Sequence, residues 1–245
     1  MPYFSVATFN VELRSWDDAA TVEAVGATEA DVVCMQEVTF DWEAVLRERY
    51  AKAYPYMLFE PRKGAGGLGV LSRFPLSDLG LVTEPHGWHP AWRLGAASPA
   101  GTIEILIVHL RALIRGESGV VGSILDVGAD HRDEIELFMG EDPPPALVVG
   151  DFNEGTGGDA VRYLEDLGFT NALPLFHPGQ ETWRGRGLAG QLGATVDHVL
   201  FDERFEPLHA WVVPRGNSDH LPVVTELELA ATTDTPPQGR DGSDG

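Results

Sequence analysis

The segment that decides the fold runs from Pro143 to Asn153 and reads PPPALVVGDFN. Three consecutive prolines end a preceding helix, because proline lacks an N–H donor and restricts the residue before it. The apolar run at residues 146–149 predicts a short strand, and the polar residues Asp151 and Asn153 follow its end. A strand this apolar is typical of a sheet covered on both faces, so the segment predicts packed sheets flanked by helices.

Strand-like and helix-like segments occur on both sides of this strand. The expected strands are residues 3–9, 32–38, 56–60, 69–72, 92–97, 102–109, 146–149, 195–201, 210–213 and 223–229. The expected helices are residues 17–30, with Asp17 as the cap, 41–51, a part of 123–139, and 159–167. Strands outnumber helices, and both types run through the whole chain.

Length and composition favour one globular domain. The 245 residues are 43% hydrophobic and 22% charged, which rules out a wholly disordered chain. We expect a single domain over residues 1–229. Residues 230–245 are rich in Thr, Pro, Gly and Asp, and we expect them to form a disordered acidic tail.

The charge of the chain limits its partners. Lys and Arg number 17 against 38 Asp and Glu, which gives a formal net charge of −21. Such a chain repels polyphosphate backbones, so neither a nucleic-acid coat protein nor a tight binder of duplex DNA is expected. A bound divalent cation can reverse the field where carboxylates cluster, which keeps phosphate-handling enzymes among the candidates. Acid excess with only two lysines fits either a halophilic host or a GC-rich genome.

The first ten residues show neither the basic nor the long apolar region of a signal peptide. No apolar stretch approaches the roughly 20 residues of a membrane span, so we expect a soluble, cytoplasmic and monomeric protein. Cys34 is the only cysteine, which excludes an intrachain disulfide and a cysteine-based zinc site. Its apolar neighbours predict a buried, inert thiol.

Polar residues follow strand-like runs at five places, and strand ends are where a rigid sheet can aim side chains into one cleft. The five are Asn10, Gln36-Glu37, His109, Asp151-Phe152-Asn153 and Asp219-His220. Taken singly, each has an ordinary explanation: a turn for Asn10, a solvated strand end for Glu37 and a helix cap for Asp151.

Taken together, these residues resemble the endonuclease/exonuclease/phosphatase superfamily, the deoxyribonuclease-I-like metal-dependent phosphoesterases. The signature of that family is an Asn after the first strand, Gln-Glu after the second, a strand-terminal His, Gly-Asp-x-Asn, a late Asp, and Ser-Asp-His. This chain has, in that order, Asn10, Gln36-Glu37, His109, Gly150-Asp151-Phe152-Asn153, Asp197 and Ser218-Asp219-His220. The resemblance covers about Ser5 to Thr225. It implies an α/β (α+β) fold: a four-layer α/β/β/α sandwich of two packed mixed sheets flanked by helices.

The resemblance also implies a metal cofactor, Mg²⁺ or Mn²⁺, and hard cations of this kind prefer oxygen ligands. Glu37 is the first expected ligand. Asn10 is expected to supply an amide oxygen, and Asp219 an additional carboxylate.

Phosphodiester hydrolysis further needs an aligned water, a base for it, and stabilisation of the charge on phosphorus. Asp151 is expected to orient or deprotonate the water, and Asn153 to hold a phosphoryl oxygen. His220, oriented by Asp197, and His109 complete the set as acid, base or phosphate clamp. Which histidine takes which role stays open.

One departure from the family pattern concerns His109. Some nucleases of the family support this histidine with a carboxylate in the strand around residues 66–73, and here that stretch reads GGLGVLSR. Either Glu60 or another group supports His109, or His109 works without such a partner. His198 follows Asp197 directly and is expected to point to the opposite face of its strand as a structural residue.

Substrate contacts are sought among Trp and Arg side chains, which stack on bases and bind phosphate. Trp88, Trp92 and Trp183 either line the mouth of the cleft or fill the edge of the core. The basic candidates are Arg111, Arg115, Arg184 and Arg186. From these we select Arg111, Trp183 and Arg184 as expected substrate contacts.

The predicted function is a divalent-metal-dependent phosphoesterase that hydrolyses phosphodiester bonds in a small or single-stranded substrate, as a nuclease or small-molecule phosphodiesterase. The nearer alternative is a phosphomonoesterase acting on an inositol phosphate, a nucleotide or a lipid head group. The more distant alternative is a non-catalytic binding module of the same fold. Such a module is expected to lose at least one of Glu37, Asp151, Asn153 and His220, and all four are present.

Overall fold

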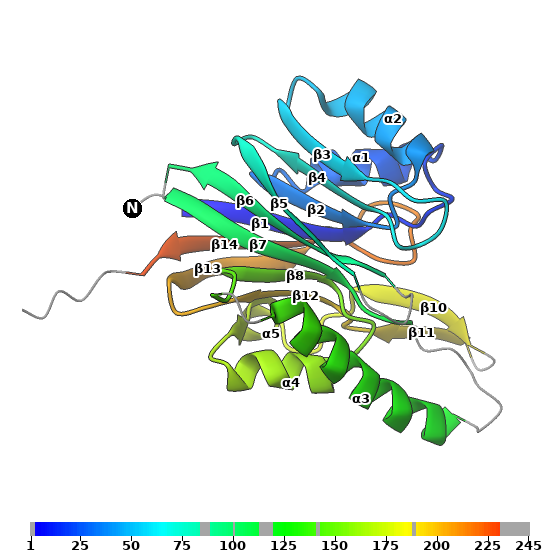
Figure 1. Ribbon diagram of the computed structural model, residues 1–245. Helices are drawn as coiled ribbons and strands as arrows, with labels where there is room; N and C mark the ends of the chain where they lie inside the picture. Colours follow the sequence, from blue (N-terminus) through cyan, green and yellow to red (C-terminus); the bar gives the residue numbers. More distant parts are fainter. Residues whose placement is uncertain are drawn as a thin grey trace, which may run out of the picture.

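The computed structural model describes residues 3–83, 89–99, 101–112, 120–140, 143–187 and 190–230. Two six-stranded sheets pack face to face, and helices cover both outer sides (Figure 1). The elements in chain order are β1 (Tyr3–Asn10), α1 (Ala19–Ala27), β2 (Val32–Gln36), α2 (Phe40–Tyr50), β3 (Tyr56–Glu60), β4 (Leu68–Ser72), β5 (Leu76–Val82), β6 (Ala91–Ser98), β7 (Gly101–His109), α3 (Val120–Met139), β8 (Leu147–Asp151), α4 (Asp159–Asp166), β9 (Thr170–Asn171), α5 (Ala172–Phe176), β10 (Trp183–Gly187), β11 (Gly190–Ala194), β12 (Asp197–Phe201), β13 (Phe205–Val212) and β14 (Val223–Leu229). The predicted four-layer sandwich is confirmed.

Both sheets are mixed. The first has the strand order β13-β14-β1-β2-β4-β3 and the second β5-β6-β7-β8-β12-β9. Each contains one parallel pair near its centre, β1 with β2 and β7 with β8, and its other pairs are antiparallel. Because parallel neighbours end at the same edge of a sheet, the residues that close these four strands are brought together in pairs.

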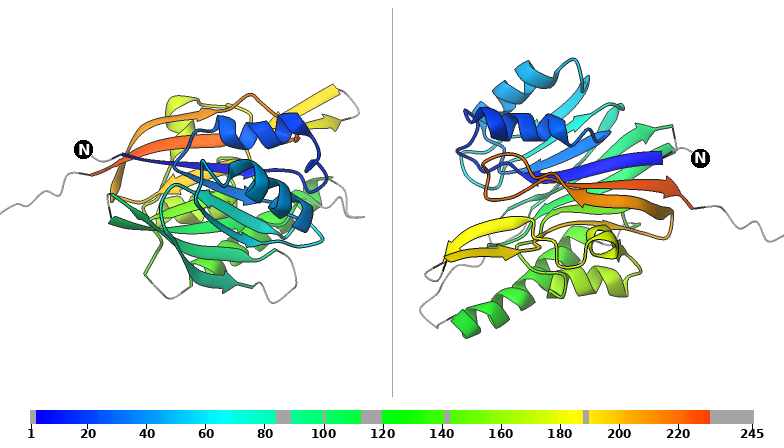
Figure 2. Two further views of the ribbon diagram at one scale, coloured as in Figure 1. Left: turned by 90° about the horizontal axis from the view of Figure 1, so that it is seen from above. Right: turned by 180° about the vertical axis from the view of Figure 1, so that it is seen from behind.

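Three apolar layers hold the sandwich together. Side chains such as Val6 and Ile107 fill the space between the sheets. Trp42 of α2 packs on the outer face of the first sheet, while Phe138 of α3 and Leu164 of α4 cover the outer face of the second. Figure 2 shows the helices on these outer sides from two further directions. Each large apolar side chain buried in this way contributes about 1.5–3 kcal/mol, so these layers dominate the stability.

Cys34 lies in the layer between the sheets and is fully buried. Burial raises the pKa of its thiol, which therefore stays protonated and unreactive. The predicted buried, inert thiol is confirmed.

Helix α1 begins two residues later than expected and has a different cap. The Asp18 carboxylate accepts a hydrogen bond from the Thr21 amide at 2.7 Å, so Asp17 as the expected cap was wrong. An acceptor at this position satisfies one of the free N–H groups of the first turn. Two adjacent aspartates made the choice ambiguous in the sequence.

Strands outside the sheet centres were predicted unevenly: the edge strand β3 was expected at residues 56–60, as observed, and several others were missed. β5, with Gly80 at a φ of 109° beside a bulge, and the hairpin of β10 and β11 were not expected. β13 was expected at residues 210–213 and begins at Phe205, with a register shift between Pro207 and His209. Glycine and proline are weak strand formers, which hides such strands in the sequence.

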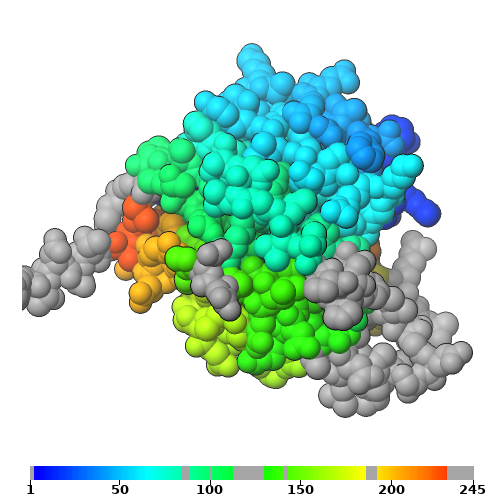
Figure 3. Space-filling model, in the orientation of Figure 1, coloured from blue at the N-terminus to red at the C-terminus, as the bar shows by residue number. Residues whose placement is uncertain are grey.

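Both ends of the described chain lie on the same side of the molecule, and the space-filling view shows β13 and β14 in orange at that side (Figure 3). Residues 231–245, nearly all of the expected acidic tail, lie outside the described residues. Trp88 and Arg115 do as well. In the part of the chain that the structure describes, no helix has the length and apolarity to cross a membrane.

Candidate active site

A cavity of about 400 Å³ lies where β1, β2, β7 and β8 end. Its lining combines charged and amide side chains with apolar and aromatic ones. The lining residues are Asn10, Glu37, His109, Ala112, Asp151, Asn153, Trp183, Ala194, Val196, Asp219 and His220. The structure thus brings together side chains that lie up to 210 positions apart in the sequence.

Strand register explains this convergence. Asn10 is the register partner of Gln36 in the first sheet, so Glu37 emerges beside it. In the second sheet, Asp151 is the partner of both His109 on β7 and Asp197 on β12. A shift of one residue in any of these pairs would turn the functional side chain to the other face.

Gly150, before Asp151, is required by the close approach of β7. A Cβ atom at this position would lie 1.9 Å from the Val108 carbonyl oxygen. Two residues of the site, Glu37 and Asn153, have positive φ angles of 63° and 51°. Such angles are uncommon without glycine and are concentrated at functional sites, where they aim a side chain that the ordinary backbone would turn away.

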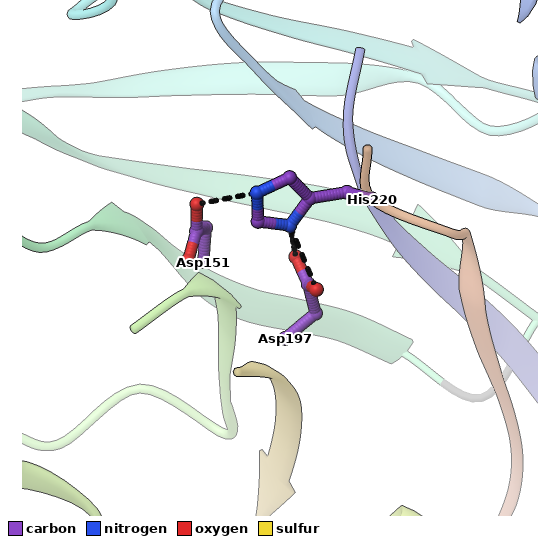
Figure 4. A group of neighbouring side chains, drawn as sticks. All are labelled: Asp151, Asp197 and His220. Atoms are coloured by element: carbon purple, nitrogen blue, oxygen red, sulfur yellow. Dashed lines mark hydrogen bonds and ion pairs between the residues drawn. The ribbon is translucent and has the colours of Figure 1, made fainter. Parts of the chain in front are cut away.

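His220 is held between two buried carboxylates (Figure 4). Its Nδ1 lies 2.9 and 3.1 Å from the carboxylate oxygens of Asp197, and its Nε2 lies 3.5 Å from Oδ2 of Asp151. The predicted pairing of His220 with Asp197 is present in the structure. Ser218 fixes the loop, because its hydroxyl donates to the Asn10 carbonyl at 2.8 Å and accepts from the His220 amide.

The electrostatics of this group favour a protonated histidine beside an ionised Asp151. Burial alone would lower the pKa of His220, but the charges of Asp197 and Asp151 outweigh it and raise the pKa to about 10. Burial would likewise raise the pKa of Asp151. The neighbouring His220 and His109 and the hydrogen bonds from Asn10 and Asn153 instead lower it below its ordinary value. His220 is therefore cationic, and Asp151 anionic, at neutral pH.

His109 approaches the same carboxylate from the other side. Its Nε2 lies 3.5 Å from Asp151 Oδ2, the same separation as for His220. Its Nδ1 lies 3.1 Å from the carbonyl oxygen of Ala65. Of the alternatives for its support, the structure therefore selects another group, a backbone carbonyl, and not Glu60. A carbonyl accepts only, so Nδ1 carries a proton, and Nε2 faces Asp151.

The hard oxygen donors of the site gather around Asn10. The Asn10 amide nitrogen lies 2.9 Å from Asp151 Oδ2 and 3.3 Å from Glu37 Oε1. Its amide oxygen accepts from the Glu12 amide, and Glu37 Oε2 accepts from the Leu13 amide. The donor types fit a hard cation such as Mg²⁺. The amide oxygen that was expected as a ligand is turned away from the carboxylates and would need a half-turn of the amide to face them.

A second set of potential ligand atoms comprises Asp151, Asp197 and His220, whose atoms lie within 4.8 Å of one another. Here both ring nitrogens of His220 already face carboxylates, and the ring is protonated at neutral pH. A protonated imidazole cannot ligate a metal, so this group suits a proton better than a cation.

The sequence model described as the Endonuclease/Exonuclease/phosphatase family matches residues 7–220. The chain belongs to the endonuclease/exonuclease/phosphatase family. Members of this family are phosphoester hydrolases and generally use a divalent metal. None of the curated proteins matches the sequence.

Solved structures of this family share the fold. An endonuclease/exonuclease/phosphatase from Beutenbergia cavernae DSM 12333 gives a TM-score of 0.72 at 18% identity, over 94% of this chain and 72% of that one. D. rerio TDP2, in complex with a single-strand DNA product, gives 0.69 at 14% identity, over 94% and 100%. ANGEL2, a 2′,3′-cyclic phosphatase in complex with adenosine-2′,3′-vanadate, gives 0.65 at 14%, over 93% and 96%. At these identities the likeness establishes the fold alone.

Of the three expected substrate contacts, only Trp183 lines the cavity. Trp183 lines the cavity, and its indole N–H donates to Asp219 Oδ2 at 2.9 Å. Arg184 is exposed beside it. Arg111 does not line the cavity, because its guanidinium pairs with Asp130 of α3. Trp92 is buried between the sheets, so it belongs to the core.

His198 is buried and lies on the side of β12 away from the cavity, as expected of a structural residue. Its Nε2 lies 3.0 Å from the Glu154 carbonyl and its Nδ1 3.0 Å from the Asn171 amide nitrogen. The side chain of Arg186 lies outside the described residues.

Several residues that build the site were not anticipated. Thr182 is buried, and its hydroxyl accepts from the amides of Val196 and Asp197 at 3.0 Å, which fixes the start of β12. Ala65 acts through its backbone, which carries no sequence signature. His89 stacks on His109. The only hint of this role in the sequence was its position between Trp88 and Trp92, which were considered as residues at the mouth of the cleft.

Proposed function

We propose that this protein is a divalent-metal-dependent phosphoesterase that hydrolyses phosphodiester bonds by in-line attack of an activated water. The observation that carries the proposal is the junction at Asp151. One carboxylate oxygen there lies within 3.5 Å of two histidines and 2.9 Å from Asn10, in a cavity that also contains Glu37. A binding module of the same fold has no need to hold two imidazoles against one ionised carboxylate.

Glu37 and Asn10 are the residues that would hold the cation, Asp219 being the third candidate. A divalent cation bound there supplies positive charge against the negative charge of the phosphoryl group. One oxygen of Asp219 already accepts from the Trp183 indole, and carboxylate oxygens can accept a further interaction. The Asn10 amide must rotate to present its oxygen, at the cost of its hydrogen bond from Glu12.

Asp151 is the proposed base. Its pKa is held below the ordinary value, so it is ionised and can accept a hydrogen bond or a proton from water. His220 is the proposed acid or phosphate clamp, because a histidine with a pKa of about 10 already carries its proton and cannot begin the cycle as a base. Asp197 keeps that proton-bearing ring oriented.

Asn153 and His109 complete the phosphate site. One N–H of the Asn153 amide donates to the Leu110 carbonyl at 2.9 Å, and the second N–H is the one proposed to hold a phosphoryl oxygen. The Ala65 carbonyl accepts from Nδ1 of His109, and Nε2 of His109 faces the same cavity, where it would donate to a phosphoryl oxygen once it also carries a proton. Two rigid polar groups are thereby aimed at the place where charge develops in the transition state.

The substrate is proposed to be a small or single-stranded phosphoester. A cavity of about 400 Å³ that Trp183, Ala194 and Val196 help to line suits a compact group with an apolar or planar part. Arg184 is exposed and does not line the cavity, so it is proposed as a phosphate contact only for a substrate that extends out of the cavity. A phosphomonoesterase using the same residues is the second candidate, since the proteins of the same fold include a 2′,3′-cyclic phosphatase as well as one in complex with a single-strand DNA product.

The test compares hydrolysis of bis-p-nitrophenyl phosphate with that of p-nitrophenyl phosphate, in Mg²⁺, in Mn²⁺ and in EDTA. We expect metal-dependent turnover of the diester, abolished by EDTA and reduced about a thousandfold in Asp151→Asn. Asp166→Asn, an exposed carboxylate of α4, is the matched control and should behave as wild type. Faster turnover of the monoester would favour the phosphomonoesterase, and unaltered turnover in Asp151→Asn would contradict the proposed site.

A further inference from the structure

The segment before β6 reaches the active site through a residue that none of the roles above includes. The ring of His89 stacks on the ring of His109, with centroids 4.3 Å apart and planes inclined by 24°. This is the parallel, close arrangement in which two planar rings restrict each other's rotation. His89 is partly buried, so the stack lies at the edge of the cavity and not in the core.

The loop between β3 and β4, residues 61–67, holds the same two rings. Its Ala65 carbonyl lies 3.1 Å from His109 Nδ1. At the next residue, a Cβ added to Gly66 would lie 2.9 Å from His89 Nδ1, so the His89 ring occupies space that a side chain at this position would need. The loop is anchored beside Glu37 by two hydrogen bonds of 3.1 Å with the backbone of Val38. His109 is thus fixed at its edge by a carbonyl and on its face by His89.

The charge state of His89 decides between two roles, binding a phosphate and packing against the ring of His109. Burial, and then the nearby His109, lower the pKa of His89 to about 4. At neutral pH the ring is uncharged, so it provides no positive charge for a phosphate. A neutral ring can still pack face to face without repelling a second imidazole, which is what the geometry shows.

We propose that His89 is a positioning residue that holds the face of His109, so that Nε2 of His109 stays directed at Asp151 and the reacting phosphate. The proposal rests on the proposed function, in which His109 contacts the substrate. It assigns to a stacked ring and a backbone carbonyl the support that some nucleases of the family take from a carboxylate. A misplacement of a catalytic group by a fraction of an ångström is enough to slow a reaction without weakening substrate binding.

The first test is a pair of substitutions at His89. His89→Ala removes the stacked ring and should lower kcat for the diester about tenfold with little change in KM. His89→Phe keeps a planar ring without ring nitrogens and should restore kcat to within about twofold of wild type. Equal losses in both variants would show that a ring nitrogen of His89 matters and would overturn the proposal. So would a change confined to KM.

The second test keeps the His89 side chain but displaces its ring by a substitution at Gly66. Gly66 has a φ outside the left-handed region, and its added Cβ meets ordinary contacts apart from His89 Nδ1. Gly66→Ala should therefore displace the His89 ring and lower kcat about as much as His89→Ala does. Gly64→Ala is the matched control, because no described atom lies within 4 Å of its added Cβ. The two effects should not add when Gly66→Ala is combined with His89→Ala, and full additivity would contradict the shared pathway.

A spectroscopic readout keeps this inference separate from the proposed activity. The Cε1–H proton of His109, assigned by its loss in His109→Gln, should be shielded by the His89 ring in wild type. It should move downfield in His89→Ala and Gly66→Ala, and stay shielded in His89→Phe and Gly64→Ala. If the protein hydrolyses neither ester but these shifts occur, the positioning holds and the proposed function fails. Shifts that are the same in all variants would overturn the positioning itself.

Discussion

Two buried histidine–carboxylate pairs, one at the start of β12 and one between α3 and the loop after β8, have nearly the same local chemistry. His220 lies 2.9 Å from Asp197, and His131 of α3 lies 3.0 Å from Glu154. All four side chains are almost fully removed from solvent. Burial alone would lower the pKa of each histidine, and in each case the partner carboxylate outweighs it and raises the pKa above the ordinary value.

The two pairs differ in what the second ring nitrogen faces. In His131, Nε2 lies 2.6 Å from the Arg111 carbonyl, and Glu154 also accepts from the Val161 amide of α4. That pair joins α3, α4 and the segment after β7. In His220, Nε2 faces Asp151 and the cavity. A shifted pKa therefore does not by itself identify a catalytic histidine. What distinguishes His220 is that its Nε2 faces the cavity, whereas Nε2 of His131 faces a backbone carbonyl.

The largest expected effect separates the pairs by activity. His220→Gln keeps a side chain of similar length but removes the proton-bearing ring, and should lower kcat/KM for the diester about a thousandfold. The same loss in His131→Gln, measured on protein shown to be folded by circular dichroism, would remove the distinction between the pairs. His209→Gln, an exposed histidine on the edge strand β13, is the control and should leave kcat/KM unchanged.

The next effect separates the pairs by stability. His131→Ala leaves the Glu154 carboxylate buried without its partner, which should lower the free energy of unfolding by about 3 kcal/mol. The neighbouring Arg132 is exposed and pairs with Glu136 on the surface of α3. Arg132→Ala should cost about 0.5 kcal/mol or less, measured by urea unfolding of both variants. The folded fraction of His131→Ala should retain wild-type kcat, and a large loss of kcat there would contradict a purely structural pair.

A smaller change in activity tests how far Asp197 matters to His220. Asp197→Asn keeps the shape of the side chain and removes its charge, so His220 loses its main source of stabilisation as a cation. We expect kcat to fall about a hundredfold, the size of loss that can follow when a catalytic group is misplaced by about 1 Å. The loss should be greatest at high pH, where the His220 ring of the variant is no longer protonated while that of the wild type still is. A pH-independent loss would mean that Asp197 only positions the ring.

These two pairs also show what the sequence could and could not predict. The pairing of Asp197 with His220 was predicted because both residues belong to a recognisable pattern, and strand register then places Asp197 beside Asp151. His131 and Glu154 belong to no such pattern. They meet because α3 packs across the loop after β8, a tertiary arrangement that local periodicity does not encode.

The sandwich itself followed from its buried strands, whose apolar runs need covering on both faces. β5 and the hairpin of β10 and β11 escaped prediction because they contain the glycine and polar residues that also make loops, whereas the edge strand β3 was predicted at its bounds. Within the site, residue types were predictable and orientations were not. His109 is supported by the backbone carbonyl of Ala65, which is 44 residues away in the sequence. The Asn10 amide points its nitrogen, not its oxygen, toward the Asp151 carboxylate. Neither a backbone atom nor an amide orientation leaves a trace in the sequence.

The smallest expected effect is the pH dependence of stability that His131 contributes. Its pKa is raised in the folded state, so the folded protein binds this proton more tightly than the unfolded chain does. The resulting stabilisation is fully present below the unfolded value of about 6.5 and is lost as the pH rises through the folded value. The difference in free energy of unfolding between wild type and His131→Gln, measured in EDTA, should therefore shrink as the pH rises above about 6.5. The stabilisation contributed by the protonated His220, measured as the difference in free energy of unfolding between wild type and His220→Gln, should be lost only as the pH rises through about 10. If the His131 difference were constant over this range, the buried pair would not depend on a protonated ring, and the likeness between the two pairs would be one of geometry only.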